Sequence, residues 1–216
     1  TKKFLQSQIS PRTYNPFHEG RPRRYAGLGL GEVCFLQHGV NRYDMSSWVT
    51  KFDKNLSLIL TVSELDYAEF TSDRYAYDNS IVQLLGYPRF DNLTNENLKK
   101  QIVIMPTWRN YIRTSTQLIN SEYFKRFNGL LNNERLIEHA KKTGYEIILK
   151  PHPSMFKFIN VFYVNDYVKV DNKTKHHVLL CDSALMITDY SSVAFDFAYL
   201  KKPVIYYHEG NDYHYD

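Results

Sequence analysis

Short apolar runs alternate with amphipathic segments along the chain, and this pattern is most distinct between residues 185 and 207. Residues 185–187 (LMI) form an apolar run suited to a buried parallel strand, and residues 189–192 (DYSS) interrupt it. Apolar residues then recur at helical spacing up to a proline: Val193, Phe197, Leu200 and Pro203. We expect Lys201 and Lys202 in the last turn of that helix and a second strand at residues 204–207.

The same alternation continues through the rest of the chain, after a polar and irregular beginning. Further apolar runs predict strands at residues 32–37, 56–62, 81–85, 101–105, 145–150 and 168–170. Amphipathic segments predict helices at residues 63–70, 121–129, 130–143, 155–160 and 176–181. Gly144 is the expected C-cap of one helix, and the polar residues 110–120 are long enough for a lid loop. Strands that alternate with helices predict an α/β fold, a doubly wound parallel sheet of Rossmann-like type.

Composition sets wide limits on the class of protein. The 216 residues suffice for one large or two small domains, and the net charge of +4 allows an anionic partner without requiring one. Cys34 and Cys181 lie in apolar segments, which favours reduced thiols in a cytoplasmic protein over a disulfide framework. No run approaches the roughly 20 apolar residues of a membrane-spanning helix. Because the chain does not begin with Met, we expect a fragment of a longer protein.

The turn at residues 189–192 is the first candidate site. A helix that begins directly after a strand points unpaired N–H groups and the positive end of its dipole at the carboxyl edge of the sheet. Ser191 and Ser192 add hydroxyl donors, so the turn is a candidate phosphate site. The alternative is that either serine serves only as the helix N-cap. This stretch alone leaves both interpretations open.

Two histidines follow predicted strands. His38 precedes a glycine at a strand end and could act as a general base, because an imidazole titrates near neutral pH; a purely structural role is equally open. His152 lies between Pro151 and Pro153, which fix the backbone and hold the imidazole in a defined direction. This rigid presentation favours a functional role, and Lys150 adds positive charge beside it.

Arg109 also follows a predicted strand. Its guanidinium is suited to bidentate bonds with phosphate oxygens, although a surface ion pair is the alternative. Metal binding is disfavoured, because His176 and His177 would face different directions on a helix and no other cluster has ligand spacing. A Walker-type phosphate loop is absent as well. The groups that follow the strands therefore indicate transfer chemistry on a nucleotide diphosphate without an obligatory metal.

Several motifs together carry a resemblance to a known family: FLQHG (35–39), MPTWR (105–109), LKPHP (149–153), ITDYSSVAFDF (187–197) and KKPVIYY (201–207). In this order and at these spacings they resemble the CDP-glycerol glycerophosphotransferases, the polymerases of teichoic acid and capsule. The resemblance implies a fold of glycosyltransferase type B, in which two Rossmann-like domains flank the active site. It further implies that residues 1–95 end the acceptor-side domain and that residues 96–216 are most of the donor-binding domain, cut at its C-terminus.

The resemblance also implies roles for individual residues. His38 would be the general base on the acceptor hydroxyl, and His152 would contact the donor diphosphate. Arg109 would face the same phosphates, and Ser191 with Ser192 would form the phosphate-binding helix start. Asp196 matches a family aspartate one turn later that holds this turn or contacts donor hydroxyls.

The implied reaction is transfer of glycerol phosphate, or a related polyol phosphate, from CDP-glycerol to a lipid-linked polyol-phosphate or glycan acceptor, with release of CMP and without a cofactor. The implied location is the cytoplasm, peripheral at the inner face of the bacterial plasma membrane. One alternative is a nucleotide-sugar-dependent glycosyltransferase of the same fold, which would release a nucleoside diphosphate. Another is a tyrosine-rich domain that binds nucleic acid. Cations at strand ends, rather than along one stripe, argue against nucleic acid as a partner.

Overall fold

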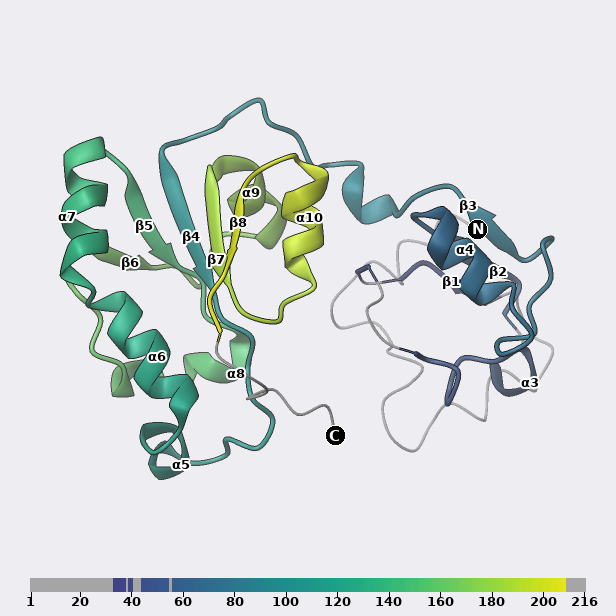
Figure 1. Ribbon diagram of the computed structural model, residues 1–216, viewed down its shortest axis with the longest axis horizontal. Helices are drawn as coiled ribbons and strands as arrows, with labels where there is room; N and C mark the ends of the chain where they lie inside the picture. Colours follow the sequence, from purple (N-terminus) through teal and green to yellow (C-terminus); the bar gives the residue numbers. More distant parts are fainter. Residues whose placement is uncertain (1–32, 38, 41–43, 55, 209–216) are drawn as a thin grey trace. The chain divides into compact units, whose positions relative to one another are not determined.

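The computed structural model describes residues 33–37, 39–40, 44–54 and 56–208 (Figure 1). These residues form two compact units, one from residues 33–37 and 44–87 and the other from residues 39–40 and 88–208. Each unit has its own parallel sheet and its own hydrophobic core. Residues 88–95, expected from the sequence to end the first domain, lie in the second unit.

The first unit contains a three-stranded parallel sheet in the order β1-β2-β3. Its elements are β1 (Cys34–Phe35), α3 (Lys51–Lys54), β2 (Leu58–Thr61), α4 (Glu64–Phe70) and β3 (Val82–Leu84). The buried side chains of Ile59, Phe70 and Val82 belong to its core. Ser63 caps α4 by accepting a hydrogen bond from the Asp66 amide at 3.1 Å. The strands and the helix predicted here are confirmed, with shorter strands than the apolar runs suggested.

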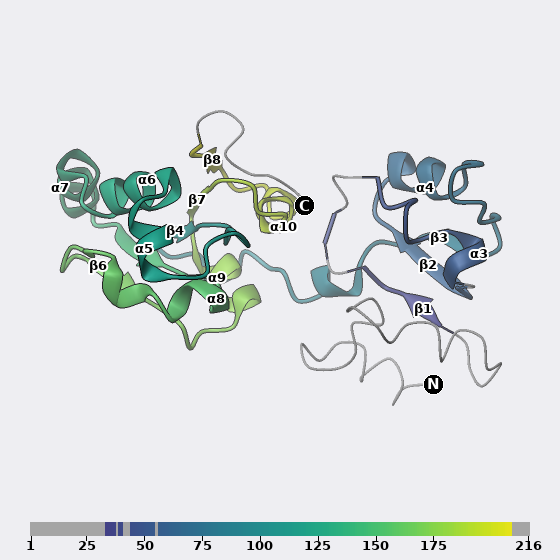
Figure 2. The same cartoon turned by 90° about the horizontal axis from the view of Figure 1, so that it is seen from below.

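The second unit contains a five-stranded parallel sheet in the order β6-β5-β4-β7-β8 (Figures 1 and 2). Its strands are β4 (Gln101–Met105), β5 (Glu146–Leu149), β6 (Val168–Val170), β7 (Leu185–Thr188) and β8 (Val204–Tyr206). All residues of β4 are buried, as the uninterrupted apolar run predicts for a central parallel strand. The chain proceeds from β4 outward to β6 and then returns to β7 on the other side of β4. The topological switch point therefore lies between β4 and β7, where ligands bind in open α/β sheets.

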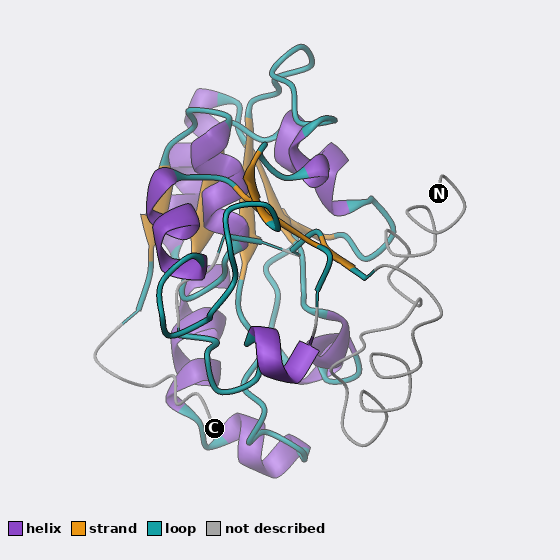
Figure 3. Cartoon of the chain, turned by 90° about the vertical axis from the view of Figure 1, so that its right-hand side faces the viewer, coloured by secondary structure: helices purple, strands orange, loops and turns teal. Residues whose placement is uncertain are grey.

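Helices precede or connect the strands of this unit. They are η1 (Pro88–Phe90), α5 (Ser115–Ile119), α6 (Glu122–Leu131), α7 (Glu134–Thr143), α8 (Pro153–Phe156), η2 (Ile159–Val161), α9 (His176–Asp182) and α10 (Val193–Tyr199). Helices α6 and α7 lie on one face and α9 on the other (Figure 2), and Figure 3 distinguishes the helices from the strands and loops. Gly144 ends α7 with a φ of 74°, a left-handed conformation that glycine adopts readily, so the predicted C-cap is confirmed.

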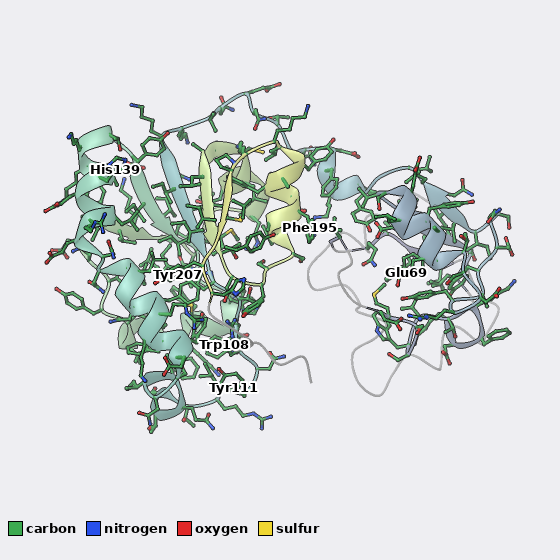
Figure 4. The ribbon with its side chains drawn as sticks, viewed as in Figure 1. Glu69, Trp108, Tyr111, His139, Phe195 and Tyr207 are labelled. Atoms are coloured by element: carbon green, nitrogen blue, oxygen red, sulfur yellow. The ribbon has the colours of Figure 1, made fainter. Side chains whose placement is uncertain are left out.

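The segment expected to be a polar lid is anchored to the second unit. Ile112 and Leu118 are buried in the core of the second unit, and residues 115–119 form α5. Thr114 and Gln117 form a capping box that starts this helix. Just before it, the Trp108 ring stacks on Phe158 with centroids 5.5 Å apart, below the carboxyl end of β4 (Figure 4). The expected loop is therefore partly helical and anchored by Ile112 and Leu118, and a lid role of this segment stays a prediction.

The expected position of Lys202 in the last turn of α10 is wrong. That helix ends at Tyr199, and the Lys202 ammonium donates to the carbonyl oxygens of Leu180 at 2.8 Å and Cys181 at 2.6 Å. These carbonyls belong to the last turn of α9, where intrahelical partners run out and a cation is favourable. Lys202 therefore stabilises the C-terminus of the neighbouring helix.

Both cysteines are partly buried, and neither Cys34 nor Cys181 is in a disulfide. Within the described residues, no helix combines the length and the apolar character that crossing a membrane requires.

Candidate functional site

The carboxyl ends of β4, β5 and β7 carry the residues that the sequence singled out for phosphate binding. Arg109 follows β4, Lys150 and His152 follow β5, and Ser191 and Ser192 follow β7. Because the carboxyl ends of parallel strands share one edge of a sheet, all of these residues lie at the same edge of the second unit. His38 lies outside the described residues, so its role as a general base stays a prediction.

Lys150 is buried at the end of β5. Its ammonium donates to the Thr174 carbonyl oxygen at 2.6 Å and lies 3.8 Å from Asp171 Oδ1. Lys150 thus ties the loop that precedes α9 to the end of β5. It contributes positive potential to the edge from below the surface, and direct contact with a donor phosphate stays a prediction.

His152 is the N-cap of α8, with Nδ1 accepting a hydrogen bond from the Ser154 amide at 3.1 Å. Because Nδ1 accepts, the neutral ring carries its proton on Nε2, which is left to donate to an acceptor such as a phosphate oxygen. The side chain remains exposed, yet desolvation by the surrounding protein lowers the pKa of His152 below its usual value. At neutral pH the ring is therefore a neutral donor rather than a cation.

The two serines differ in their bonding. Ser191 Oγ accepts a hydrogen bond from the Val193 amide at 3.3 Å, so its hydroxyl stabilises the turn just before α10. Ser192 occupies the N-cap position of α10, but its hydroxyl makes no capping bond with the helix amides in this part of the structure. Both side chains are half-buried. The Ser192 hydroxyl is consequently not needed by the start of α10.

Arg109 is enclosed within the unit. Its Nη1 lies 2.9 Å from Asp189 Oδ2, and the two side chains are 1% and 0% exposed. The guanidinium carbon lies 5.0 Å from the ring centroid of Tyr123 and 5.1 Å from that of Tyr190. Asp189 Oδ1 accepts hydrogen bonds from the amides of Thr107 and Tyr190, each at 2.8 Å. The surface ion pair considered from the sequence is wrong, because this pair is buried, and phosphate contact by Arg109 stays a prediction.

Arg89 and Asp196 form an ion pair that the sequence analysis missed. The Arg89 Nη2 group donates to Asp196 Oδ2, and the carboxylate is buried at the inner face of α10. Burial raises the pKa of Asp196 to about 6, against the opposing influence of the Arg89 guanidinium. Arg89 follows β3 in the chain. The rule that selected Arg109, a cation after a strand, could therefore have found Arg89 as well.

Gly39, the residue after His38, lies against the same groups. A Cβ atom at Gly39 would be 3.2 Å from Ser192 Oγ and 3.5 Å from Arg89 Nη1. A contact of 3.2 Å is tighter than ordinary van der Waals packing, so a larger residue would displace the Ser192 hydroxyl. The glycine of the QHG motif thus lets the backbone approach the start of α10 and Arg89.

His176, the first residue of α9, belongs to the same electrostatic environment. Desolvation lowers the pKa of His176, and the nearby charges of Lys150, Arg89 and His152 lower it further. From the sequence, His176 was considered only as a metal ligand, and that role was disfavoured. Throughout the described ranges, no three His, Cys, Asp or Glu side chains are placed to hold a metal ion. The requirement for no metal is not tested by this observation and stays a prediction.

The edge of the second unit thus combines basic groups, a histidine donor and a serine hydroxyl that makes no capping bond to α10 within the described residues. These groups lie at the switch point of a parallel sheet. Guanidinium and imidazole N–H groups at such an edge are suited to phosphate oxygens. This arrangement is typical of Rossmann-like α/β proteins that bind phosphorylated ligands, and the predicted α/β class is confirmed.

The family model described as CDP-Glycerol:Poly(glycerophosphate) glycerophosphotransferase matches residues 37–216, and the chain belongs to this family. The chain is 43% identical over 196 residues to the minor teichoic acid biosynthesis protein GgaB of Bacillus subtilis (strain 168). This alignment covers 85% of the chain and 22% of GgaB. The chain is also 31% identical over 159 residues to the teichoic acid glycerol-phosphate primase of the same organism. This alignment covers 68% of the chain and 39% of the primase.

Among solved structures, the wall teichoic acid polymerase TagF is similar with a TM-score of 0.50 and 21% identity, covering 72% of this chain and 42% of that chain. This likeness shows the fold. The chain spans less than half the length of each of these three proteins.

Proposed function

We propose that this chain is the donor-binding part of an enzyme that transfers glycerol phosphate, or a related polyol phosphate, from a CDP-activated polyol to a growing teichoic-acid or capsule polymer. The observation that carries the proposal is the gathering of Lys150, His152 and Ser192 at the carboxyl edge of one sheet in a member of this family. The two Bacillus subtilis relatives, named for teichoic acid biosynthesis, support a teichoic acid as the acceptor.

In this reaction the terminal hydroxyl of the polymer attacks the β-phosphorus of CDP-glycerol. A phosphorus–oxygen bond forms to the polymer, and the bond from the same phosphorus to the bridging oxygen breaks, so that CMP leaves with the electron pair. Phosphoryl transfer depends mainly on positioning and on neutralising charge. His38 is the proposed acceptor of the hydroxyl proton, and such a base contributes roughly 10²–10⁴-fold to the rate.

Groups at the sheet edge would act on the donor. The Nε2–H group of His152 is oriented by the Nδ1 bond to the Ser154 amide and is available to donate to a diphosphate oxygen. Lys150 adds positive potential from beneath the edge. Both groups would stabilise the negative charge that develops on the departing phosphate. In this proposal they supply the neutralisation for which many phosphoryl-transfer enzymes use Mg²⁺.

The partners follow from this chemistry. The donor is a CDP-polyol made from cytoplasmic nucleotides, and the acceptor is a polyol-phosphate or glycan chain on a lipid. An enzyme that joins them works at the inner face of the plasma membrane, so a peripheral location there is part of the proposal. The nucleotide-sugar alternative differs in its product, since it releases a nucleoside diphosphate instead of CMP.

The test is calorimetric titration of the 216-residue chain with CDP-glycerol, CDP-ribitol, CMP and UDP-N-acetylglucosamine, each in the presence of EDTA. We expect a CDP-polyol to bind more tightly than CMP, and the preferred CDP-polyol identifies the polyol. Binding of UDP-N-acetylglucosamine alone would replace the proposal with the glycosyltransferase. Binding that appears only when Mg²⁺ replaces EDTA would overturn the metal-free part of the proposal.

A further inference from the structure

The Arg89–Asp196 pair joins a buried carboxylate to a partly exposed guanidinium. The Asp196 side chain is 1% exposed, whereas the Arg89 side chain is 32% exposed. Arg109–Asp189 is buried at both ends, and Arg74–Asp44 on the first unit is exposed at both ends, by 61% and 48%. One end of the Arg89 guanidinium is thus fixed inside the unit while another part faces solvent.

Asp196 is placed at an energetic cost. A buried carboxylate loses its hydration, and one ion pair compensates for this loss only in part. Among the described residues, no group donates a hydrogen bond to Asp196 Oδ1, although this oxygen is buried. An unpaired buried acceptor is destabilising, so this oxygen adds to the energetic cost of the pair. Retention of such a carboxylate is typical of a functional site.

The surroundings of Arg89 belong to the candidate site. Its Nη1 lies near Gly39, beside the Ser192 hydroxyl, and its charge acts on His176. A guanidinium has five N–H donors in a planar fork, and the contact with Asp196 Oδ2 uses one edge of this fork. The remaining donors can take phosphate oxygens in the bidentate geometry that arginine favours.

We propose that Arg89 binds a phosphoryl oxygen of the substrate and that Asp196 is the positioning residue that orients the Arg89 guanidinium. This inference rests on the proposed function, because it assigns a further residue to the site of the transferred phosphate. Arg89 holds the phosphate between the helix start at Ser192 and the histidines that follow β5 and β6. Asp196 touches no substrate and acts only through Arg89.

The experiment compares Arg89→Gln, Arg89→Lys and Asp196→Asn with the matched control Arg74→Gln, which removes a guanidinium from an exposed Arg–Asp pair. Calorimetry measures the Kd of CDP-glycerol, CMP and glycerophosphoglycerol for each variant of the 216-residue chain, and circular dichroism confirms that each variant is folded. We expect Arg89→Gln to weaken CDP-glycerol binding about tenfold or more and Arg74→Gln to leave it within about twofold. Loss confined to glycerophosphoglycerol would assign Arg89 to the acceptor phosphate instead of the donor diphosphate.

A double-mutant cycle isolates the positioning role. Asp196→Asn should weaken binding when Arg89 is present and have no further effect in the Arg89→Gln background, because Asp196 acts through Arg89. Additive losses would overturn the assignment of Asp196. Wild-type affinity in folded Arg89→Gln would overturn that of Arg89.

The two proposals can fail separately. If the wild-type chain prefers a UDP-sugar and Arg89→Gln abolishes that binding, the glycerophosphotransferase assignment fails while the phosphate role of Arg89 stands. If no nucleotide binds the wild-type chain, titration with inorganic pyrophosphate is followed by the NMR signals of the arginine side chains. An Arg89 signal that pyrophosphate does not shift overturns the inference.

Discussion

Arg109 and Asp189 join the turn after β4 to the turn after β7, with Nη1 of the arginine 2.9 Å from Oδ2 of the aspartate. These turns flank the topological switch point, and Asp189 also accepts the Thr107 amide at 2.8 Å. The pair therefore sets the spacing of the two loops from below. Ser191 and Ser192 follow Asp189 within three residues, so their position depends on a contact that is buried within the unit.

Removal of either partner should strongly destabilise the second unit. Arg109→Ala leaves the Asp189 carboxylate buried without its counter-charge, and such losses cost about 3–5 kcal/mol. Urea denaturation followed by tryptophan fluorescence measures this, because Trp108 adjoins Arg109. The control is Lys99→Ala, which breaks a partly exposed pair with Asp182 and should cost less than about 1 kcal/mol.

The same variants distinguish positioning from direct phosphate contact by Arg109. A positioning role predicts that Arg109→Ala and Asp189→Ala lower the free energy of unfolding and donor affinity together. If Arg109→Ala unfolds like the wild type and yet loses donor binding, then Arg109 reaches the phosphates in a conformation different from this one.

The sheet of the second unit could be predicted because its central strands β4, β5 and β7 are largely buried and therefore appear in the sequence as apolar runs. Residues 101–105 and 168–170 were predicted as strands at their observed bounds, since each is a compact β-favouring run beside a turn. Helix α5 was missed although Thr114 and Gln117 have the spacing of a capping box. The hydrogen bonds of Lys202 could not be predicted, because the carbonyl groups that accept them belong to a helix about twenty residues earlier in the sequence.

The site could be predicted only in part. Strand ends are readable from the sequence, and this placed His152 and the serines at one edge of the sheet. The sequence does not reveal which cations are buried, so Arg109 was assigned to the phosphates and Arg89 was overlooked. Burial depends on contacts between distant segments, such as Arg89 with Asp196, which no local pattern specifies.

His38 and His152 should separate catalysis from binding. His38→Ala removes the proposed base, so we expect turnover to fall by roughly 10²–10⁴-fold while the Kd of CDP-glycerol is unchanged. His152→Ala removes a proposed donor to the diphosphate and should weaken binding. Turnover is measured as release of CMP, with an active enzyme that contains this chain. Calorimetry measures the Kd. Equal loss of binding in both variants would contradict this division of roles.

Gly39 and Ser192 should be energetically coupled. Gly39→Ala places a Cβ 3.2 Å from the Ser192 hydroxyl, which must shift, whereas Ser192→Ala removes the crowded atom. In a double-mutant cycle, Ser192→Ala should therefore recover part of the donor affinity lost in Gly39→Ala, with a coupling of about 0.5–3 kcal/mol. Gly129→Ala is the control, since a Cβ there meets nothing within 4 Å. Strict additivity of the two substitutions would show that the residues do not pack together in solution.

Asp196 should make stability depend on pH in a direction opposite to that of a typical salt-bridged carboxylate. Burial raises its pKa from 3.8 to about 6, so the native state holds this proton more tightly than the unfolded chain. The resulting stability is complete below about pH 4 and is lost as the pH rises through about 6, and a difference of this size corresponds to roughly 3 kcal/mol.

The measurement is urea denaturation of the wild type and of Asp196→Asn between pH 4 and 7. His152 and His176 also titrate near this edge, with lowered pKa values, and they act in the opposite sense because protonating a desolvated imidazole costs stability as the pH falls. Arg89 and Lys150 are basic side chains that lie near the same edge. Subtracting the Asp196→Asn curve removes the shared histidine contribution, and the difference should decline with rising pH. Arg89 holds the pKa of Asp196 down, so Arg89→Gln should move this decline in stability above pH 6. If the difference curve is flat both with Arg89 and with Gln at position 89, then the Asp196 carboxyl is solvated in solution.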